Sequence, residues 1–251
     1  MKISKTIAAM VALIFLLACN PSGNGSQPIA STDPLAVLPL GTANDFARGC
    51  GIPLEPYDAL RLATEGEPVH IDIPSANGEY FANVASGGFG AEITVGTNPQ
   101  LKKAIGGGAY ALTGIVAAAK MEPYAGRFVS ADEKAEKEFI VMAVGNARQA
   151  GGGFQVTPNA SLDDGLMDVM VISDFQTKDL GLVIQEAQDF TNTDNQFVHY
   201  RQVPGFEIEV PAKVPINLDG EPHRWDHITF EILPMCLPVV LPDNCPLVKE
   251  T

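Results

Sequence analysis

Short apolar runs separated by turn residues are the feature that most limits how this chain can fold. The 251 residues include 24 Gly and 19 Pro, and aromatic residues make up only 7%. Turn-forming residues at this frequency favour strands and tight turns over a helical bundle. Apolar residues account for 46% of the chain, which allows a sizeable core and excludes a disordered protein.

The apolar runs indicate where strands should form, because they alternate or are apolar throughout. We predict strands over 35–40, 69–73, 80–85, 139–144, 169–172, 206–210, 216–218 and 228–233. Asn77-Gly78 predicts a hairpin turn between two of these strands. A helix is expected over 56–63, and the apolar segment 109–121 is typical of a helix that is buried or meets an apolar partner. The predicted fold class is therefore α+β.

The charge of the chain limits its partners. Acidic residues number 30 and basic residues 16, which gives a net charge of −14. Because nucleic-acid binding needs clustered Lys and Arg, we expect no nucleic-acid partner. The four cysteines, at positions 19, 50, 236 and 245, are too few for a disulfide scaffold and match no zinc-binding spacing.

The N-terminus is typical of an exported protein. Lys2 and Lys5 precede an uncharged apolar run over 6–17, and Leu16-Leu17-Ala18-Cys19 resembles a bacterial lipobox. We expect residues 1–18 to be a signal sequence, Cys19 to be lipidated and 19–34 to be a flexible tether. The protein would then be a membrane-anchored lipoprotein on the periplasmic or cell-surface side. The alternative is a wrongly assigned start or a buried helix, which leaves the protein cytoplasmic.

The segment after the first predicted strand could bind an anion. Gly41-Thr42 turns the chain, and 42–45 fits a capping box, so a helix is expected to begin at Ala43. Free N–H groups at a helix start, together with the helix dipole, favour an anion. An ordinary connection between a strand and a helix is the alternative.

Several carboxylates lie in turns marked by Gly at strand ends. They are Asp163, Asp164, Asp168, Asp219 and Glu221. Oxygen ligands of this kind suit Mg²⁺, although Asp-Gly pairs also form turns without any further role. Residues 86–90 contain three Gly, which indicates a tight turn or the close approach of a ligand.

Five segments together resemble the catalytic superfamily of diacylglycerol kinases, and within it the bacterial YegS-like lipid kinases. They are 38–48 (LPLGTANDFAR), 81–90 (FANVASGGFG), 145–153 (GNARQAGGG), 158–166 (PNASLDDGL) and 217–222 (NLDGEP). The segment LPDNCP over 241–246 extends the resemblance, which covers about residues 35–248.

The resemblance implies two lobes and phosphoryl transfer from ATP to a lipid hydroxyl. A remnant of an α/β nucleotide-binding lobe would combine 35–66 with 232–251, and a β-sandwich-like lobe would span 67–231. Thr42 would contact the nucleotide, and Glu221 would be the general base. Mg²⁺ would be held at Ser161, Asp164 and Leu166, through backbone carbonyls and the Asp164 carboxylate. Asp164, Asp219 and Glu221 should then converge on one cleft facing Thr42.

One family feature has no counterpart in the 251 residues, which contain no Gly-Gly-Asp-Gly-Thr segment. That loop cradles the ATP phosphates in the family, and its absence indicates a front truncation. Because phosphoryl transfer depends on positioning and charge stabilisation, we expect weak ATP binding and impaired transfer. The alternative function is that of an exported lipoprotein that uses the β lobe to bind lipid without catalysis.

Overall fold

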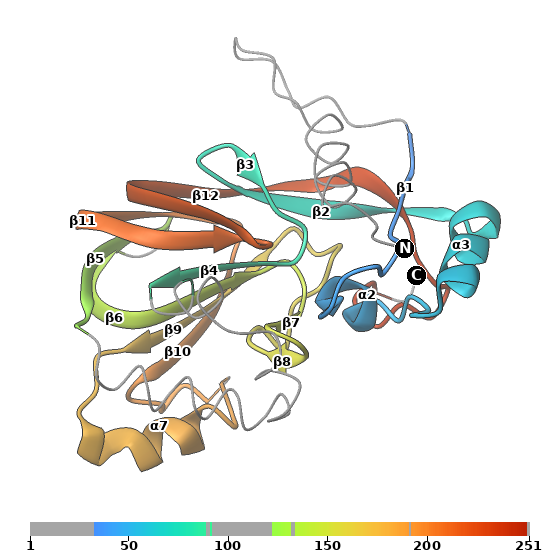
Figure 1. The fold of residues 1–251 in the computed structure, drawn as a ribbon. Coiled ribbons are helices and arrows are strands. Elements are labelled where there is room, and N and C mark those ends of the chain that lie inside the picture. The colour runs from blue at the N-terminus through green and yellow to red at the C-terminus, as the bar shows by residue number, and fades with distance from the viewer. Residues whose placement is uncertain (1–32, 89–90, 92–121, 132–133, 191, 250–251) are drawn as a thin grey trace, which may run out of the picture.

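The computed structural model describes residues 33–88, 91, 122–131, 134–190 and 192–249. The expected signal sequence, Cys19, most of the tether and the apolar segment 109–121 lie outside the described residues. The described part is mostly β-strand with few helices (Figure 1). In this part of the chain, no helix is long and apolar enough to cross a membrane.

One large sheet forms the body of the molecule, and its strand order is β10-β9-β6-β4-β11-β12-β2-β3. The strands are β2 (Pro68–Ala76), β3 (Glu79–Tyr80), β4 (Val84–Gly88), β5 (Tyr124–Val129), β6 (Lys134–Gly145), β9 (Met167–Ser173), β10 (Val198–Val203), β11 (Gly205–Leu218) and β12 (Glu221–Val240). Both β4 and β5 pair with β6 and with β11, so these four strands close on themselves. A separate small hairpin joins β7 (Gln149–Ala150) to β8 (Phe154–Gln155).

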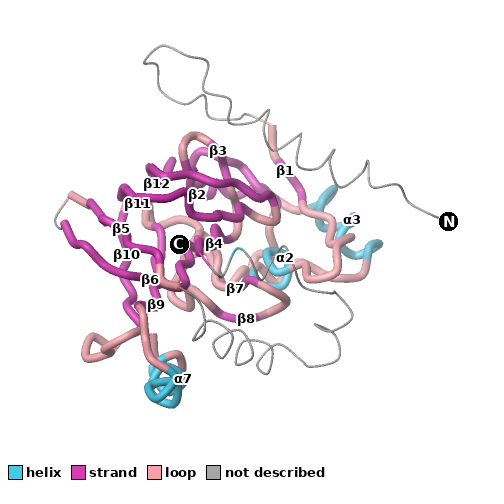
Figure 2. The backbone as a smooth tube through the Cα atoms, turned by 60° about the vertical axis from the view of Figure 1, so that its left-hand side comes forward, coloured by secondary structure: helices cyan, strands magenta, loops and turns pink. Residues whose placement is uncertain are grey.

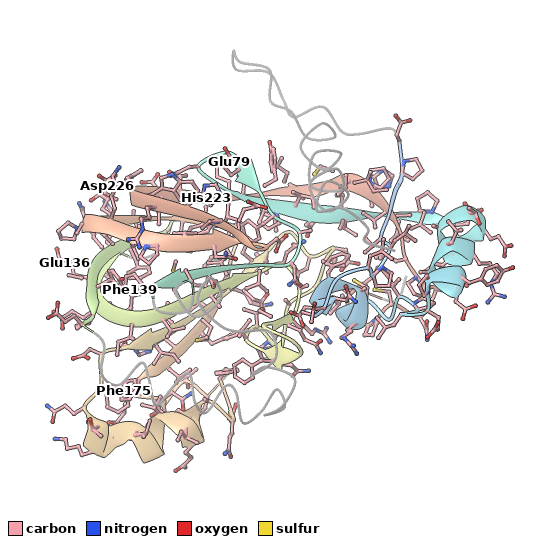
Figure 3. All side chains as sticks on the ribbon, viewed as in Figure 1. Glu79, Glu136, Phe139, Phe175, His223 and Asp226 are labelled. Atoms are coloured by element: carbon pink, nitrogen blue, oxygen red, sulfur yellow. The ribbon has the colours of Figure 1, made fainter. Side chains whose placement is uncertain are left out.

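Alternation along β6 and β9 explains why the run 139–144 is apolar throughout. Met142 and Val171 face one core cluster, while Ile140 and Met170 face another. The second cluster is covered by the 3₁₀ turn η1 (Thr177–Asp179) and α7 (Leu180–Glu186), next to which Phe175 lies (Figure 3). A strand buried on both faces has no need for polar residues, so its sequence does not alternate.

The long strand β12 joins the sheet to the N-terminal segment. Its first part pairs with β11, and its last part pairs with β2, with Leu237 opposite Ile71. It also pairs in parallel with β1 (Leu35–Ala36), where Val239 lies opposite Leu35. The expected contact between the two ends of the fold is therefore present. The proposed lobe boundary at 231/232 falls inside β12, and the division into lobes stays a prediction.

Two helices lie at one side of the strands, beside β1 (Figure 2). α3 (Pro56–Glu65) begins with Pro, as a helix start favours, and confirms the helix predicted over 56–63. α2 (Asp45–Gly49) has only five residues. A third core cluster, which includes Ala47, Ala59 and Leu237, is shared by β2, β12 and both helices.

The predictions for 35–45 are wrong in two respects. The strand expected over 35–40 has only two residues, and Leu38 and Leu40 are 42% and 60% exposed. The helix begins at Asp45 rather than Ala43, with Asn44 as the N-cap in a left-handed conformation. The Asn44 side chain accepts a hydrogen bond from the Gly41 N–H and donates to the Pro39 carbonyl. These local bonds compete with helix formation and take the place of the expected Thr42 cap.

The hairpin at Asn77-Gly78 is confirmed, with φ values of 52° and 81°. The strand predicted over 80–85 is divided between β3 and β4. Gly87 lies within β4 rather than in a turn, and a β-carbon there would lie 2.8 Å from Met142 Cε and 3.0 Å from Ile216 Cδ1. The described glycines of 86–90 therefore allow close packing of the core.

Candidate functional site

A tight turn at Asp219-Gly220 joins β11 to β12, and side-chain hydrogen bonds hold it in place. The Asp219 carboxylate accepts hydrogen bonds from the backbone N–H groups of Ala82 (2.6 Å), Val84 (2.9 Å) and Asn83 (3.1 Å). Loss of solvent around this carboxylate raises the pKa of Asp219, while the N–H donors favour its charged form. Asp219 thus fixes the segment between β3 and β4 against the turn.

A cavity of about 400 Å³ lies between this turn and the segment that carries α2. Its walls come from 37–39, 43–47, 82–84, 86, 150–151, 217 and 219–220. Polar side chains line both sides, with Asn44 and Asp45 on one and Asn83, Asn217 and Asp219 on the other. The cavity therefore offers oxygen and nitrogen atoms to a polar ligand group.

Two buried polar atoms at this cavity lack a partner among the described residues. They are the amide nitrogen of Asn217 and the amide oxygen of Asn83. Asn217 is only 3% exposed, and its own oxygen accepts the Gly220 N–H at 2.8 Å. Buried polar groups in native proteins are nearly always hydrogen-bonded, so an unpaired donor and acceptor point to a ligand. The sequence placed Asn217 in a motif, but its unpaired state depends on the fold.

The expected anion site at the helix start stays a prediction. The Asp45 carboxylate lies in the first turn of α2 and accepts N–H groups of Gly152 (2.9 Å) and Gly153 (2.6 Å). This carboxylate is therefore bonded to the loop at 152–153, and no described side chain caps the start of α2. Thr42 is exposed and directly precedes Ala43, which lines the cavity. The role of Thr42 as a nucleotide contact stays a prediction.

The predicted metal ligands lie in a different turn, 161–166. Asp164 accepts the Leu166 N–H at 3.1 Å, and its carboxylate lies 3.9 Å from the Lys249 ammonium. The Ser161 hydroxyl donates to Asp163 at 2.7 Å. Ser161 and Asp164 line a second cavity, of about 450 Å³, together with Arg148 and Lys249.

The expected convergence of Asp164, Asp219 and Glu221 on one cleft stays a prediction. Asp219 lines the first cavity and Asp164 the second. Glu221 is exposed at the first residue of β12 and directly follows Gly220, which lines the first cavity. The two turns belong to different strand connections, one before β9 and one between β11 and β12.

The turn 161–166 has the chemistry that Mg²⁺ requires. The proposed ligands are the Asp164 carboxylate and the backbone carbonyls of Ser161 and Leu166, which are all oxygen donors. The Lys249 ammonium lies 3.9 Å from the Asp164 carboxylate, so a positive charge is already present beside this turn. In the described part of the chain, no group of three or more His, Cys, Asp or Glu side chains could hold a metal. A bound ion would therefore depend on carbonyl oxygens and water as well as Asp164.

Asp72 on β2 holds the turn 161–166 through a hydrogen bond, a role that was not predicted from the sequence. It is fully buried and accepts N–H groups of Gly165 (2.6 Å) and Met235 (2.8 Å). Burial raises the pKa of Asp72, the two N–H donors lower it, and the charges of Asp164 and Asp163 raise it further. In the sequence Asp72 looks like an ordinary polar position between Ile71 and Ile73.

A second buried carboxylate, Asp168, gives a prediction for pH dependence. It accepts hydrogen bonds from the Tyr200 hydroxyl and from Gln202 (3.1 Å). Burial raises the pKa of Asp168 to about 6 from an ordinary value of 3.8, so the folded state holds this proton more tightly than the unfolded state. Stability from this group is then fully present below pH 4 and is lost as the pH rises to about 6, by about 3 kcal/mol.

The variant Asp168→Asn should lack this pH dependence. Urea unfolding of both proteins from pH 4 to pH 7, with a chelator present, measures the difference in the free energy of unfolding. The prediction is contradicted if the free energies of unfolding of the wild type and of Asp168→Asn differ by the same amount at every pH from 4 to 7.

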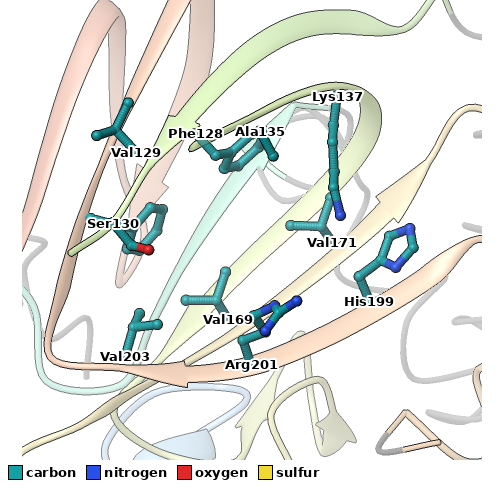
Figure 4. A pocket seen from close by; sticks show the side chains of 11 residues that line it. Phe128, Val129, Ser130, Ala135, Lys137, Val169, Val171, His199, Arg201 and Val203 are labelled. Atoms are coloured by element: carbon teal, nitrogen blue, oxygen red, sulfur yellow. The ribbon is translucent and has the colours of Figure 1, made fainter. Parts of the chain in front are cut away.

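A smaller cavity of about 90 Å³ lies among strands β5, β6, β9 and β10, and its walls are largely apolar (Figure 4). Its walls are Phe128, Val129, Ser130, Ala135, Val169, Val171, Val203 and Phe206. The basic side chains of Lys137, His199 and Arg201 also line it. Burial and the charges of Lys137 and Arg201 lower the pKa of His199. Apolar walls with positive charges beside them suit an anionic amphiphile.

Comparisons with known proteins identify the relatives of this chain. Residues 83–241 match the YegS C-terminal NAD kinase beta sandwich-like domain, and residues 18–76 match the diacylglycerol kinase catalytic domain. The "Probable lipid kinase YegS-like" of Shewanella frigidimarina is 44% identical over 86% of this chain and 70% of its own length. The protein of the same description in Chromohalobacter salexigens is 40% identical over 91% of this chain and 74% of its own length.

Solved structures show the same fold. The crystal structure of a diacylglycerol kinase from Bacillus anthracis aligns with a TM-score of 0.61 and 21% identity. The alignment covers 84% of this chain and 68% of that one.

Proposed function

Because the chain belongs to the YegS-like lipid kinase family, we propose that it transfers the terminal phosphate of ATP to a lipid hydroxyl. The observation that carries this proposal is the cavity between α2 and the Asp219 turn. Asn217 and Asn83 both line that cavity, and the buried amide nitrogen of Asn217 and amide oxygen of Asn83 have no partner among the described residues. A donor suits a phosphate oxygen, and an acceptor suits a hydroxyl group.

Each residue of the turn 217–221 has a distinct proposed role. Asp219 holds the turn rigid by accepting hydrogen bonds from three backbone N–H groups, which is a structural role. Glu221 follows two residues later with an exposed carboxylate, and it accepts the proton of the lipid hydroxyl as general base. Asn217 donates to an oxygen of the transferred phosphate, where charge must be stabilised.

The magnesium ion of the proposal would be held by Asp164 and the carbonyls of Ser161 and Leu166. Such an ion supplies positive charge that neutralises surrounding oxygens. The turn 161–166 that would hold the ion is itself fixed to the C-terminal segment. The Leu247 carbonyl accepts hydrogen bonds from the Leu162 N–H (2.7 Å) and from the Ser161 hydroxyl (3.1 Å).

Nucleotide binding by the 251 residues should be weak. They contain no Gly-Gly-Asp-Gly-Thr segment, and α2 is too short to replace one. A helix terminus contributes about 0.3–2 kcal/mol toward an anion, whereas millimolar affinity already requires about 4 kcal/mol. We therefore propose a kinase that is impaired in ATP binding while its lipid contacts are retained.

The variant Asn217→Asp tests the site. Aspartate keeps the oxygen that accepts the Gly220 N–H but replaces the unpaired donor with an acceptor that repels phosphate. Transfer of labelled phosphate to diacylglycerol or phosphatidylglycerol should fall about 100-fold. The control Asn244→Asp makes the same charge change on an exposed turn and should keep the wild-type rate. Equal rates for Asn217→Asp and wild type would reject the proposed role of this cavity.

A second function is favoured by the apolar cavity with Lys137, His199 and Arg201. The chain would then be an exported lipoprotein, anchored through lipidated Cys19, that binds anionic lipid without catalysis. Flotation with phosphatidylglycerol vesicles should in that case weaken in Lys137→Glu, with no phosphate transfer in either protein. Recovery of the wild-type chain as a soluble species that starts at Met1 would exclude the anchor.

A further inference from the structure

Two buried cysteines from opposite ends of the fold lie in direct contact. Cys50 follows the last residue of α2 and is completely buried, and Cys245 is 8% exposed in the C-terminal segment. The side chains of Cys50 and Cys245 are hydrogen-bonded to each other, and both belong to the same core cluster. Both cysteines are in the reduced state in the structure.

The backbone on both sides of Cys50 packs against the residues after Cys245. A β-carbon on Gly49 would lie 3.4 Å from Leu247 Cδ1, and one on Gly51 would lie 3.8 Å from Pro246 Cδ. Both segments are also held by their own backbone bonds, from Cys50 N–H to Phe46 and from Cys245 N–H to Pro242. The two chain segments therefore hold the sulfur atoms together, and a disulfide requires such proximity.

We propose that Cys50 and Cys245 are an oxidative modification site that forms a disulfide between α2 and the C-terminal segment. The co-reactant is a small disulfide such as oxidised glutathione. The proposal does not depend on the kinase or on its substrate.

Cys245 is the residue that reacts first. The hydrogen bond from Cys50, the N–H groups of Leu247 and Val248 and the charge of Arg148 lower the pKa of Cys245 to about 7, against the effect of burial. The adjacent residue Pro246 lines the cavity of about 450 Å³ that also contains Arg148 and Lys249. The cavity also contains the carboxylate of Asp164, so its charged side chains carry a net charge of +1, which favours the anionic glutathione disulfide beside Cys245. Burial and the neighbouring sulfur raise the pKa of Cys50, which keeps its proton.

The reaction has two steps. The Cys245 thiolate attacks one sulfur of the glutathione disulfide, a mixed disulfide forms, and one glutathione thiolate leaves and takes a proton from solvent. The Cys50 sulfur then attacks the Cys245 sulfur, the mixed disulfide breaks, and the Cys50 proton passes to the second glutathione. Two cysteine thiols are oxidised, and one glutathione disulfide is reduced to two thiols.

Peptide mapping of the full chain after treatment with oxidised glutathione tests the proposal. Trypsin combined with cleavage before Asp separates Cys236 from Cys245 and gives fragments 49–57 and 243–249. We expect these two fragments to be linked without reductant and separate with it, and the count of free thiols in the denatured chain to fall by two. Links to Cys236 or Cys19, or glutathione on Cys245 with no link to Cys50, would overturn the proposal.

Variants of single cysteines distinguish a link between Cys50 and Cys245 from a link that involves Cys236. Cys236→Ser should keep the linked fragments, and Cys245→Ser should lose them. Because the bond closes a long loop, the oxidised wild-type chain should unfold about 5 °C or more above the reduced chain, and Cys245→Ser should show no such rise. A rise of the same size in Cys245→Ser would also overturn the proposal.

Discussion

Replacing Asp72 by alanine is expected to lower the free energy of unfolding by about 3 kcal/mol, because two backbone donors lose their acceptor. The Asp72 carboxylate binds the N–H groups of Gly165 and Met235 from a fully buried position. Both acceptor bonds hold unusual backbone, since φ is 72° at Gly165 and 50° at Met235. Removal of the carboxylate therefore loosens the turn 161–166 and the irregular part of β12 together.

The conservative variant Asp72→Asn provides the control. It keeps one acceptor oxygen, and it removes the repulsion from Asp163 and Asp164 that raises the pKa of Asp72. Its loss of stability should be clearly smaller than that of Asp72→Ala. Urea unfolding measures both variants, and a loss below about 1 kcal/mol for Asp72→Ala would contradict this role.

The second large effect concerns catalysis. Glu221→Gln is expected to lower phosphate transfer to lipid by about 10²–10⁴-fold, because an amide cannot accept the hydroxyl proton. The side chain is exposed at the start of β12, so the substitution should leave the unfolding midpoint unchanged. The loss should appear in kcat, since Glu221 acts on the proton rather than on ATP binding.

A carboxylate on the same strand serves as the matched control for Glu221. Asp226 is also exposed on β12, and Asp226→Asn should retain the wild-type rate (Figure 3). An undiminished rate in Glu221→Gln would assign the base to another group.

Local patterns predicted the elements that depend on local physics. Asn77-Gly78 forms its hairpin because both residues tolerate positive φ, and Pro56 begins α3 because its missing N–H costs nothing there. The run 139–144 forms a strand because two core clusters bury both of its faces.

Tertiary contacts decided what local patterns could not. The strand predicted over 228–233 is part of β12, which continues past Pro234 and Pro238 to Val240 through an irregularity between Leu233 and Leu237. The Met235 N–H in this irregular segment donates a hydrogen bond to the carboxylate of Asp72, which supports the backbone there. Asp72 itself has no sequence signal that distinguishes it from a polar strand position.

The sequence predicted which segments form the candidate site, but not how their side chains are arranged. The segments 38–48 and 217–222 do meet at one cavity. Asp219 and Asp164 line different cavities, an assignment that short motifs do not encode. The unpaired state of Asn217 and the contact of Cys50 with Cys245 likewise depend on segments that are distant in sequence.

Transfer of labelled phosphate from ATP to a lipid hydroxyl, measured on the 251-residue chain over a range of ATP concentrations, tests the central claim most directly. The account predicts labelled lipid whose rate of formation rises with ATP and reaches half its maximum only above about 1 mM. Absence of labelled lipid at every ATP concentration, from a folded chain that still binds lipid vesicles, would contradict it.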